Sequence, residues 1–304
     1  MTHNLTGRGW LALLTSVGLW GSGFVGIRMA LPAYSPSHLA LLRFLAASAT
    51  ILIYALIAGV RLPARKDVLY ILLMGFISIS VYHLALNAGE RTVTAGSASM
   101  LIASGPIFSA LLARAVLDER LRLWGWIGIA ISFAGVSLIA IGEGGGLHFN
   151  RGAFLVLIAA LATGISVVLQ KHYLKTYNVT DFSTHLILAG TLFLLIFLPG
   201  LAGEIRHAPL GATMAVVYLG VFPAAIAYLT WGYVLKRIPA SVAASSLYTP
   251  PIFAIAIGWL VLREVPSALS IVGGAVALAG VTLVNAKGHV MKSEEVAVFA
   301  ADGD

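Results

Sequence analysis

Long hydrophobic stretches separated by short polar loops occupy almost the whole chain. About 20 apolar residues suffice for an α-helix to cross the ~30 Å hydrocarbon core of a bilayer. Ten such stretches are present, at about 10–31, 38–59, 67–89, 93–114, 122–141, 152–171, 183–201, 209–235, 240–262 and 267–285. The pattern predicts an all-α polytopic membrane protein with ten transmembrane helices.

The hydrophobic pattern is repeated within the chain. Residues 95–138 correspond to residues 240–283 at a constant offset of 145 positions. At this offset Pro106 matches Pro251, Glu119 matches Glu264, and Gly128 matches Gly273. Matches at one fixed spacing indicate an internal duplication.

The duplication determines the expected architecture. Each half contains five predicted helices, an odd number, so the second half enters the membrane in the opposite sense to the first. This arrangement predicts two inverted five-helix repeats around a central cavity, which can open alternately to either side. We assign residues 1–145 to the first repeat, 146–286 to the second, and 287–304 to a flexible cytoplasmic tail.

Composition and charge support this interpretation and set the orientation. The chain is 59% hydrophobic and 10% charged, whereas soluble domains carry roughly 25% charged residues. With a cytoplasmic N-terminus, 13 basic residues lie in cytoplasmic segments and four in outer loops. Basic residues concentrate on the cytoplasmic side of membrane proteins, so both termini are expected there. The net charge of +7 follows from this bias, and without a basic patch it predicts no nucleic-acid binding.

Several motifs resemble one known family over nearly the whole chain. They are "LWGSGFVGIR" at 19–28, Arg43 early in the second helix, the run from Tyr82 to Leu121, and its second copy from Ala227 to Val265. Together they resemble the drug/metabolite transporter superfamily, in particular its ten-helix EamA-type family, and within it the YddG-type amino-acid exporters. The resemblance implies a multi-pass protein of the bacterial inner (plasma) membrane that exports small molecules.

Prolines interrupt two predicted helices at matched positions. Pro106, Pro250 and Pro251 lie near the middle of their stretches, where proline removes a helical hydrogen bond. We expect these breaks to line a cavity and to serve in gating, with a simple packing kink as the alternative. Pro223 has no matched proline, because its counterpart is Ser78, and it is interpreted as a simple kink.

Polar and aromatic side chains within the predicted helices are candidates for a substrate pocket, because aromatic faces and hydroxyl groups suit an amphipathic molecule. The alternatives are interfacial aromatic belts and helix packing. The candidate substrate-binding residues are Trp20, Ser22, Arg43, Tyr82, His83, Asn87, Met100, Ser104, Tyr228, Trp231, Ser245, Tyr248 and Thr249.

Titratable groups within the predicted helices help to distinguish proton-dependent transport from facilitated diffusion, because a charge at membrane depth is usually functional. The acids Glu90, Glu119, Glu143, Glu204 and Glu264 all fall at helix ends or in loops. His83 is the one titratable group well placed to carry a proton, so we expect facilitated diffusion or weak proton dependence.

Two arginines lie within predicted helices. For Arg28 the favoured interpretation is snorkelling of the guanidinium to the head groups. For Arg43 the sequence leaves open whether it does the same or binds a substrate carboxylate.

The resulting functional hypothesis is an exporter of amino acids and related small metabolites. Alternatives are an exporter of cationic drugs or a carrier of phosphorylated metabolites. A membrane enzyme or receptor is disfavoured, because no catalytic or metal-ligand motif is present in the sequence. We expect no cofactor, a small-molecule substrate and the lipid bilayer as partners, and a monomer or homodimer. The spaced glycines Gly128, Gly135, Gly273 and Gly280 are interpreted as packing surfaces, with a dimer contact as the alternative.

Overall fold

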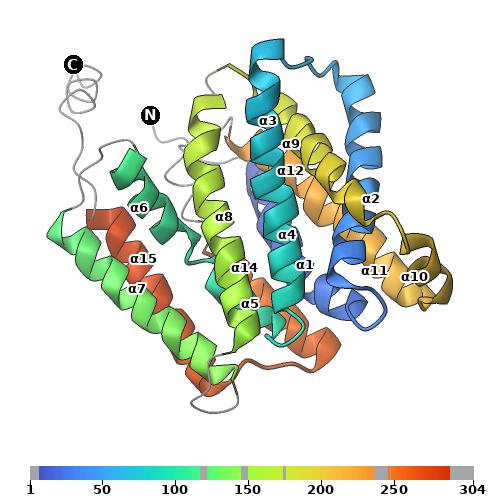
Figure 1. Cartoon of the computed structure of the whole chain (residues 1–304). Coiled ribbons are helices and arrows are strands. Elements are labelled where there is room, and N and C mark those ends of the chain that lie inside the picture. The colour runs from blue at the N-terminus through green and yellow to red at the C-terminus, as the bar shows by residue number, and fades with distance from the viewer. Residues whose placement is uncertain are drawn as a thin grey trace, which may run out of the picture.

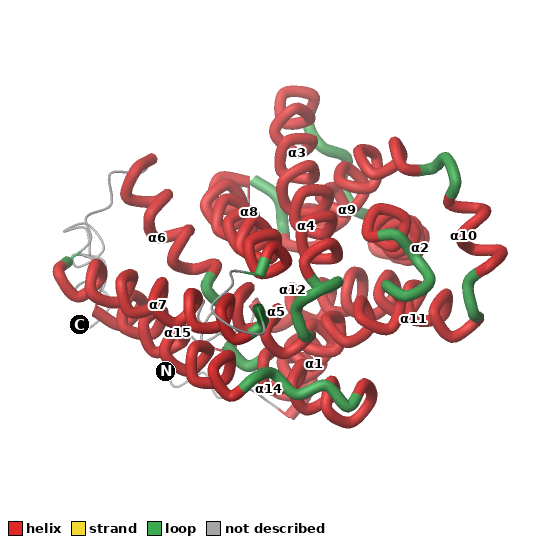
Figure 2. Tube along the Cα trace, turned by 60° about the horizontal axis from the view of Figure 1, so that its bottom comes forward, coloured by secondary structure: helices red, strands yellow, loops and turns green. Residues whose placement is uncertain are grey.

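The computed structural model describes residues 7–116, 122–144, 150–173, 176–235, 246 and 248–287. The described part of the chain is built from helices and loops, with no strand (Figure 2). The α-helices of the first half are α1 (Gly7–Ala30), α2 (Pro36–Ala58), α3 (Val68–Gly75), α4 (Tyr82–Gly89), α5 (Ala95–Ile102), α6 (Gly105–Val116) and α7 (Leu123–Gly142). Those of the second half are α8 (Arg151–Tyr173), α9 (Val179–Leu194), α10 (Leu201–His207), α11 (Leu210–Val221), α12 (Ala227–Leu235), α14 (Pro250–Ile257) and α15 (Ala268–Lys287) (Figure 1). Short 3₁₀ segments occur at Arg65–Asp67 and Leu195–Phe197, and π-helical segments at Phe76–Val81, Phe222–Ile226 and Gly258–Leu262.

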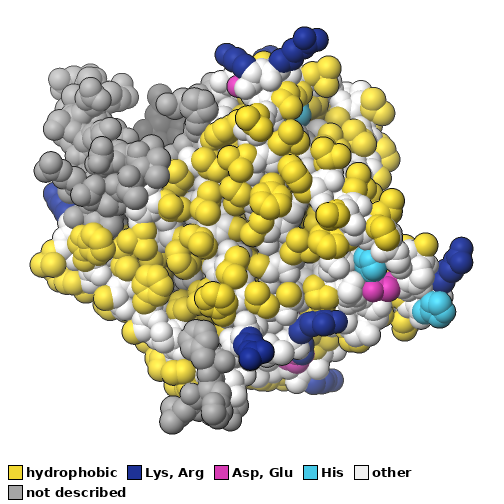
Figure 3. All heavy atoms as spheres, in the orientation of Figure 1, with side chains coloured by type: hydrophobic (Ala, Val, Ile, Leu, Met, Phe, Trp, Pro, Cys, Tyr) yellow, Lys and Arg dark blue, Asp and Glu magenta, His cyan; other side chains and the backbone are white. Residues whose placement is uncertain are grey.

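The helices form a bundle with a hydrophobic surface. Within the described residues, eight continuous helical segments are long and apolar enough to cross a membrane, and each overlaps one of the first eight predicted stretches. Two shorter apolar helices, Pro250–Leu262 and Ala268–Val284, coincide with the last two. In Figure 3, hydrophobic side chains cover the middle of the visible face, while lysine and arginine side chains gather mainly toward its edges. This distribution is typical of a multi-pass membrane protein, while the number of ten spans stays a prediction.

The proline-containing stretches are broken in the same way in both halves. Pro106 is the second residue of α6, and Pro250 and Pro251 begin α14, where a missing backbone N–H is tolerated. Directly before each of these two helices, a side-chain hydroxyl donates to the backbone carbonyl three residues earlier. The bond from Ser104 to Leu101 is 2.6 Å long, and that from Thr249 to Ser246 is 2.7 Å long. These equivalent bonds lie 145 residues apart, so the breaks belong to the repeated unit.

A second irregularity is also repeated. The π-helical segment η2 (Phe76–Val81) lies directly before α4, and η4 (Phe222–Ile226) lies directly before α12. Pro223 is in η4, whereas its counterpart Ser78 is in η2 and shares a hydrogen bond with Ser166. The deformation at Pro223 therefore has an equivalent in the first half that contains no proline. Single-turn π segments are often found at functional sites.

Helices α7 and α15 pack closely through their glycines. A Cβ added at Gly128 would lie 2.7 Å from the carbonyl oxygen of Gly280, and one at Gly273 would lie 2.6 Å from that of Gly135. As residue numbers rise along α7, those of its contacts on α15 fall, so these equivalent helices run antiparallel (Figure 1). Antiparallel equivalents are what an inverted repeat requires, and the interpretation of these glycines as packing surfaces within the chain is confirmed.

Candidate functional site

Four side chains from α2 and α4 form the centre of the candidate site. The ring of His83 lies 4.6 Å from that of Phe44 and 4.6 Å from that of Tyr82, measured between centroids. The Arg43 guanidinium stacks over Phe44, with its carbon 5.6 Å from the ring centroid. Arg43 and His83 are buried, at 6% and 5% exposure, while Tyr82 is half-buried. A cation is therefore held among aromatic rings in the interior of the bundle.

An aromatic group from α1 and α12 adjoins this centre. Trp20 contacts Tyr228 and Trp231, with ring centroids 5.8 and 5.2 Å apart. Tyr228 interacts electrostatically with both Arg43 and Tyr82, which connects the two groups. We call Trp20, Arg43, Tyr82, His83 and Tyr228 the central cluster.

The polar side chains of this region retain unused hydrogen-bonding capacity. Arg43 Nε, His83 Nδ1 and Asn87 Oδ1 are buried without a hydrogen-bond partner among the described residues. Asn87 uses its amide nitrogen to donate to the carbonyl oxygen of Pro36 over 3.0 Å. Buried polar atoms without partners are costly, so several of them in one place indicate a site that a ligand completes.

Other candidates from the sequence have different local contacts. Ser22 is half-buried and shares a hydrogen bond with the Tyr218 hydroxyl over 2.7 Å. Met100 is buried against Gly274 of α15, and Ser104 and Thr249 make the bonds at the two helix breaks. Tyr248 packs beside the hydrophobic group that contains Ile107. Ser245 lies outside the described residues.

Glu90 is an acidic residue of the interior that the sequence pattern did not single out as a site residue. It directly follows α4 and is 0% exposed, and neither carboxylate oxygen has a hydrogen-bond partner within the described chain. Burial raises the pKa of its carboxyl group well above the usual range, and the nearby Arg28 and Arg43 oppose this effect. His83, Asn87 and Glu90 follow an i, i+4, i+7 spacing, which places them along one face of α4 and its end.

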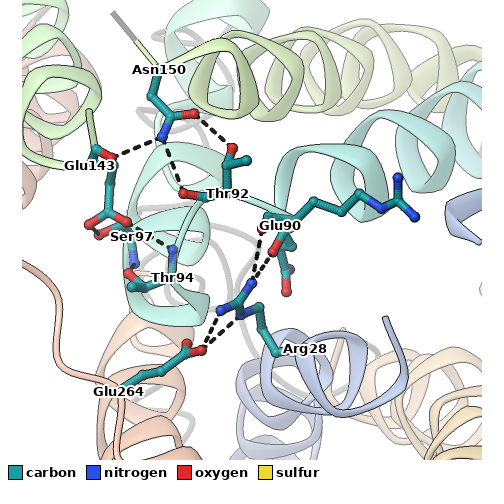
Figure 4. A network of polar contacts seen from close by, with 9 residues as sticks. Arg28, Glu90, Thr92, Thr94, Ser97, Glu143, Asn150 and Glu264 are labelled. Atoms are coloured by element: carbon teal, nitrogen blue, oxygen red, sulfur yellow. Dashed lines mark hydrogen bonds and ion pairs between the residues drawn. The ribbon is translucent and has the colours of Figure 1, made fainter. Parts of the chain in front are cut away.

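A polar network joins the two halves beside Glu90 (Figure 4). The Arg28 guanidinium donates to Glu264 Oε1 through Nε over 3.0 Å and through a terminal nitrogen over 2.5 Å. Its other terminal nitrogen donates to the backbone carbonyl of Glu90 over 2.5 Å. Arg28 is thus half-buried and paired with an acidic partner from the other repeat, while its snorkelling to the head groups stays a prediction.

A second set of contacts reinforces the same end of the bundle. Glu143, at the end of α7, accepts hydrogen bonds from the Thr94 backbone N–H and from the hydroxyls of Ser97 and Ser270. Asn150 donates to the backbone carbonyl of Glu143 over 2.9 Å (Figure 4). Ser270 belongs to α15, so this network also spans both halves. We call the end of the bundle that carries these contacts the Arg28 end.

A surface pocket of about 770 Å³ is present at the Arg28 end, away from the central cluster. Arg28, Met29 and Leu262 line one part of it, and Gly203, Glu204, His207, Ala208, Pro209, Gly211 and Ala212 line another. The ion pair between His38 and Glu204, 2.8 Å between Nδ1 and Oε1, lies beside it. Among the described residues, no group of three or more His, Cys, Asp or Glu side chains is arranged to hold a metal ion.

Comparison with known proteins gives consistent matches along the chain. The model of the EamA-like transporter family matches twice, over residues 7–141 and 150–286. The uncharacterized transporter YdfC of Bacillus subtilis (strain 168) is 42% identical over 94% of this chain and 93% of its own length. The probable terminal-alkyne amino-acid exporter of Streptantibioticus cattleyicolor is 39% identical over 91% of this chain and 92% of its own length.

More distant matches extend this pattern. The uncharacterized inner membrane transporter YedA of Escherichia coli (strain K12) is 28% identical over 79% of this chain and 78% of its own length. One solved crystal structure superimposes with a TM-score of 0.61 at 19% identity, covering 91% of this chain and 96% of its own. The latter similarity concerns the fold alone.

Proposed function

Because the chain belongs to the EamA-like transporter family, we propose that it exports amino acids and related small metabolites by alternating access. The proposed topology has ten membrane-spanning helices in two inverted halves, residues 1–145 and 146–286, with both termini and the tail 287–304 in the cytoplasm. The Arg28 end then faces the outside of a bacterial inner membrane. The functional unit is a monomer or homodimer.

The observation that carries this proposal is the central cluster. Arg43 and His83 are buried and retain unpartnered nitrogen atoms, beside half-buried tyrosine rings. A guanidinium group binds a carboxylate through two parallel hydrogen bonds, and aromatic rings contact apolar side chains and cations. These groups come from α2, α4, α1 and α12, so both halves contribute to the site. The similarity to a relative named as an amino-acid exporter supports the same substrate class.

Energy coupling follows from the titratable groups near the cluster. His83 is the titratable imidazole at its centre and packs between Phe44 and Tyr82. We propose transport that is facilitative or weakly proton-dependent, because this single imidazole is the group of the cluster best placed to carry a proton near neutral pH.

The proposal is tested by flux measurements with purified protein in liposomes. A panel of labelled amino acids is supplied with and without a pH gradient, and His83→Ala and Tyr228→Ala are compared with the wild type. Saturable flux that either substitution reduces by about tenfold or more supports the site, since each removes a group in direct contact with substrate. Equal wild-type rates with and without the gradient support facilitated diffusion. Absence of flux for every amino acid contradicts the proposed substrate class.

A further inference from the structure

The guanidinium group of Arg43 and the carboxyl group of Glu90 are both buried in the bundle and do not pair with each other. Glu90 is 0% exposed and Arg43 6% exposed, and the two interact electrostatically. Yet the ion pairs found among the described residues are those of Arg28 with Glu264 and His38 with Glu204. Arg43 Nε and both carboxylate oxygens of Glu90 remain without a hydrogen-bond partner there.

This separation is energetically unfavourable in the absence of a ligand. A buried guanidinium or carboxyl group without a hydrogen-bonded partner destabilises the protein. Arg28 offsets part of this cost electrostatically, but it donates no hydrogen bond to the Glu90 carboxyl group, because its guanidinium donates to the backbone carbonyl of Glu90 and to the carboxylate of Glu264. The unpartnered guanidinium and carboxyl group are therefore explained more readily by a ligand than by stability, since an ammonium group beside Glu90 favours the ionised form of its carboxyl group.

We propose that Glu90 binds the ammonium group of an amino acid whose carboxylate is held by Arg43. This inference rests on the proposed function and adds to it the recognition of both backbone charges of the substrate. The side chain of the substrate is then left to face the aromatic rings of the central cluster.

The dimensions of a zwitterion suit this arrangement. The ammonium nitrogen and the carboxylate of an α-amino acid lie about 3 Å apart, and each charge-assisted hydrogen bond adds about 2.8 Å. A bound amino acid thus separates the two protein charges by roughly 8–9 Å, within the range of an electrostatic interaction but beyond direct contact. Tyr82 lies within electrostatic range of both Arg43 and Glu90.

Other charged groups near Glu90 are already engaged. Arg28 and Glu264 interact electrostatically with Glu90 but are bonded to each other. The face of α4 that leads from His83 through Asn87 to Glu90 adds an unpartnered amide oxygen, which can accept a further ammonium hydrogen. The Glu90 side of this region thus offers acceptors, and the Arg43 side offers donors.

The test is competition against labelled amino-acid uptake in liposomes. The competitors are the unlabelled amino acid, its N-acetyl derivative, which lacks the ammonium charge, and its amide, which lacks the carboxylate. We expect Glu90→Gln to reduce the preference for the amino acid over the N-acetyl derivative by about tenfold or more, because the lost partner of the ammonium is a charged one. Arg43→Gln is expected to reduce the preference over the amide by a similar factor, while leaving discrimination against the N-acetyl derivative largely intact.

The controls separate recognition from structural damage. Glu204→Gln removes a carboxylate at the same end whose partners are Ser35 and His38, and it should leave both preferences unchanged. If Glu90→Gln does not fold, Glu90→Asp keeps the charge and should weaken uptake while preserving the preference over the N-acetyl derivative. Wild-type amino-acid flux with preferences unaltered by Glu90→Gln overturns this inference alone. Absence of wild-type amino-acid flux overturns the proposed function as well.

Discussion

Arg28 of the first half and Glu264 of the second form an ion pair of 2.5 Å that joins the two repeats at one end of the bundle. The same guanidinium donates to the carbonyl of Glu90, so one side chain holds three segments together. Halves that exchange conformations must separate at such a contact. The bonds of Arg28 are therefore expected to favour the state that is closed at this end.

We predict that Glu264→Gln increases access to the interior from the Arg28 end. The chain contains no cysteine, so a thiol introduced by Ser22→Cys reports access through its reaction with a membrane-impermeant maleimide. Loss of the charge weakens the ion pair and is expected to accelerate labelling about fivefold, corresponding to roughly 1 kcal/mol. Arg206→Gln, at an exposed position in α10, serves as the control. Equal labelling rates with and without Glu264→Gln would show that the ion pair does not control opening.

A second prediction concerns the chemical identity of the cation in the central cluster. Arg43→Lys keeps the positive charge but loses the planar fork and the stacking on Phe44. We expect the half-saturation constant for the transported amino acid to rise about tenfold or more, because the bidentate bond to its carboxylate is lost. Arg206→Lys, at an exposed position in α10, should leave this constant unchanged. A similar constant for Arg43→Lys and the wild type would mean that charge alone is required.

Most of the fold could be predicted from the sequence, because a bilayer admits few kinds of spanning structure, of which the long apolar helix is one. Helix length and the glycine spacing of α7 and α15 depend on neighbouring residues, and the 145-residue repeat can be read directly from the sequence. The helices and the glycine packing of the structure agree with these predictions. The burial of Glu90 could not be predicted in the same way. Its position after α4 looks like an ordinary helix end, and its enclosure depends on how the first and second halves meet.

The site was predictable in part for a related reason. Tyr82, His83 and Tyr228 stand out because polar aromatic groups are rare within membrane helices, and the structure places them together with Arg43. Arg28 and Glu264 are 236 positions apart, so no local pattern connects them. Only their proximity in three dimensions shows that the arginine is paired.

The third prediction addresses the packing of α7 against α15. Gly128→Ala would place a methyl group 2.7 Å from the carbonyl oxygen of Gly280, too close for a backbone atom to accommodate without movement. We expect a loss of about 1–3 kcal/mol in the free energy of unfolding, the usual cost of overpacking. Thermal unfolding in detergent is the measurement, and Gly211→Ala is the matched control, since an added Cβ there meets nothing within 4 Å. Equal stability of the two variants would contradict close packing at Gly128.

The fourth prediction tests whether the π-helical segment η4 depends on its proline. Because η2 adopts the same irregularity around Ser78 without proline, the deformation of η4 is attributed to its surroundings, where Pro223 is buried. Pro223→Ala restores one backbone N–H but leaves those surroundings in place, so Tyr228 should keep its position in the central cluster. We expect amino-acid flux within about twofold of the wild type, in contrast to the loss expected for Tyr228→Ala. If Pro223→Ala instead lowers flux as much as Tyr228→Ala does, the proline itself maintains the segment, and the equivalence of η2 and η4 is only geometric.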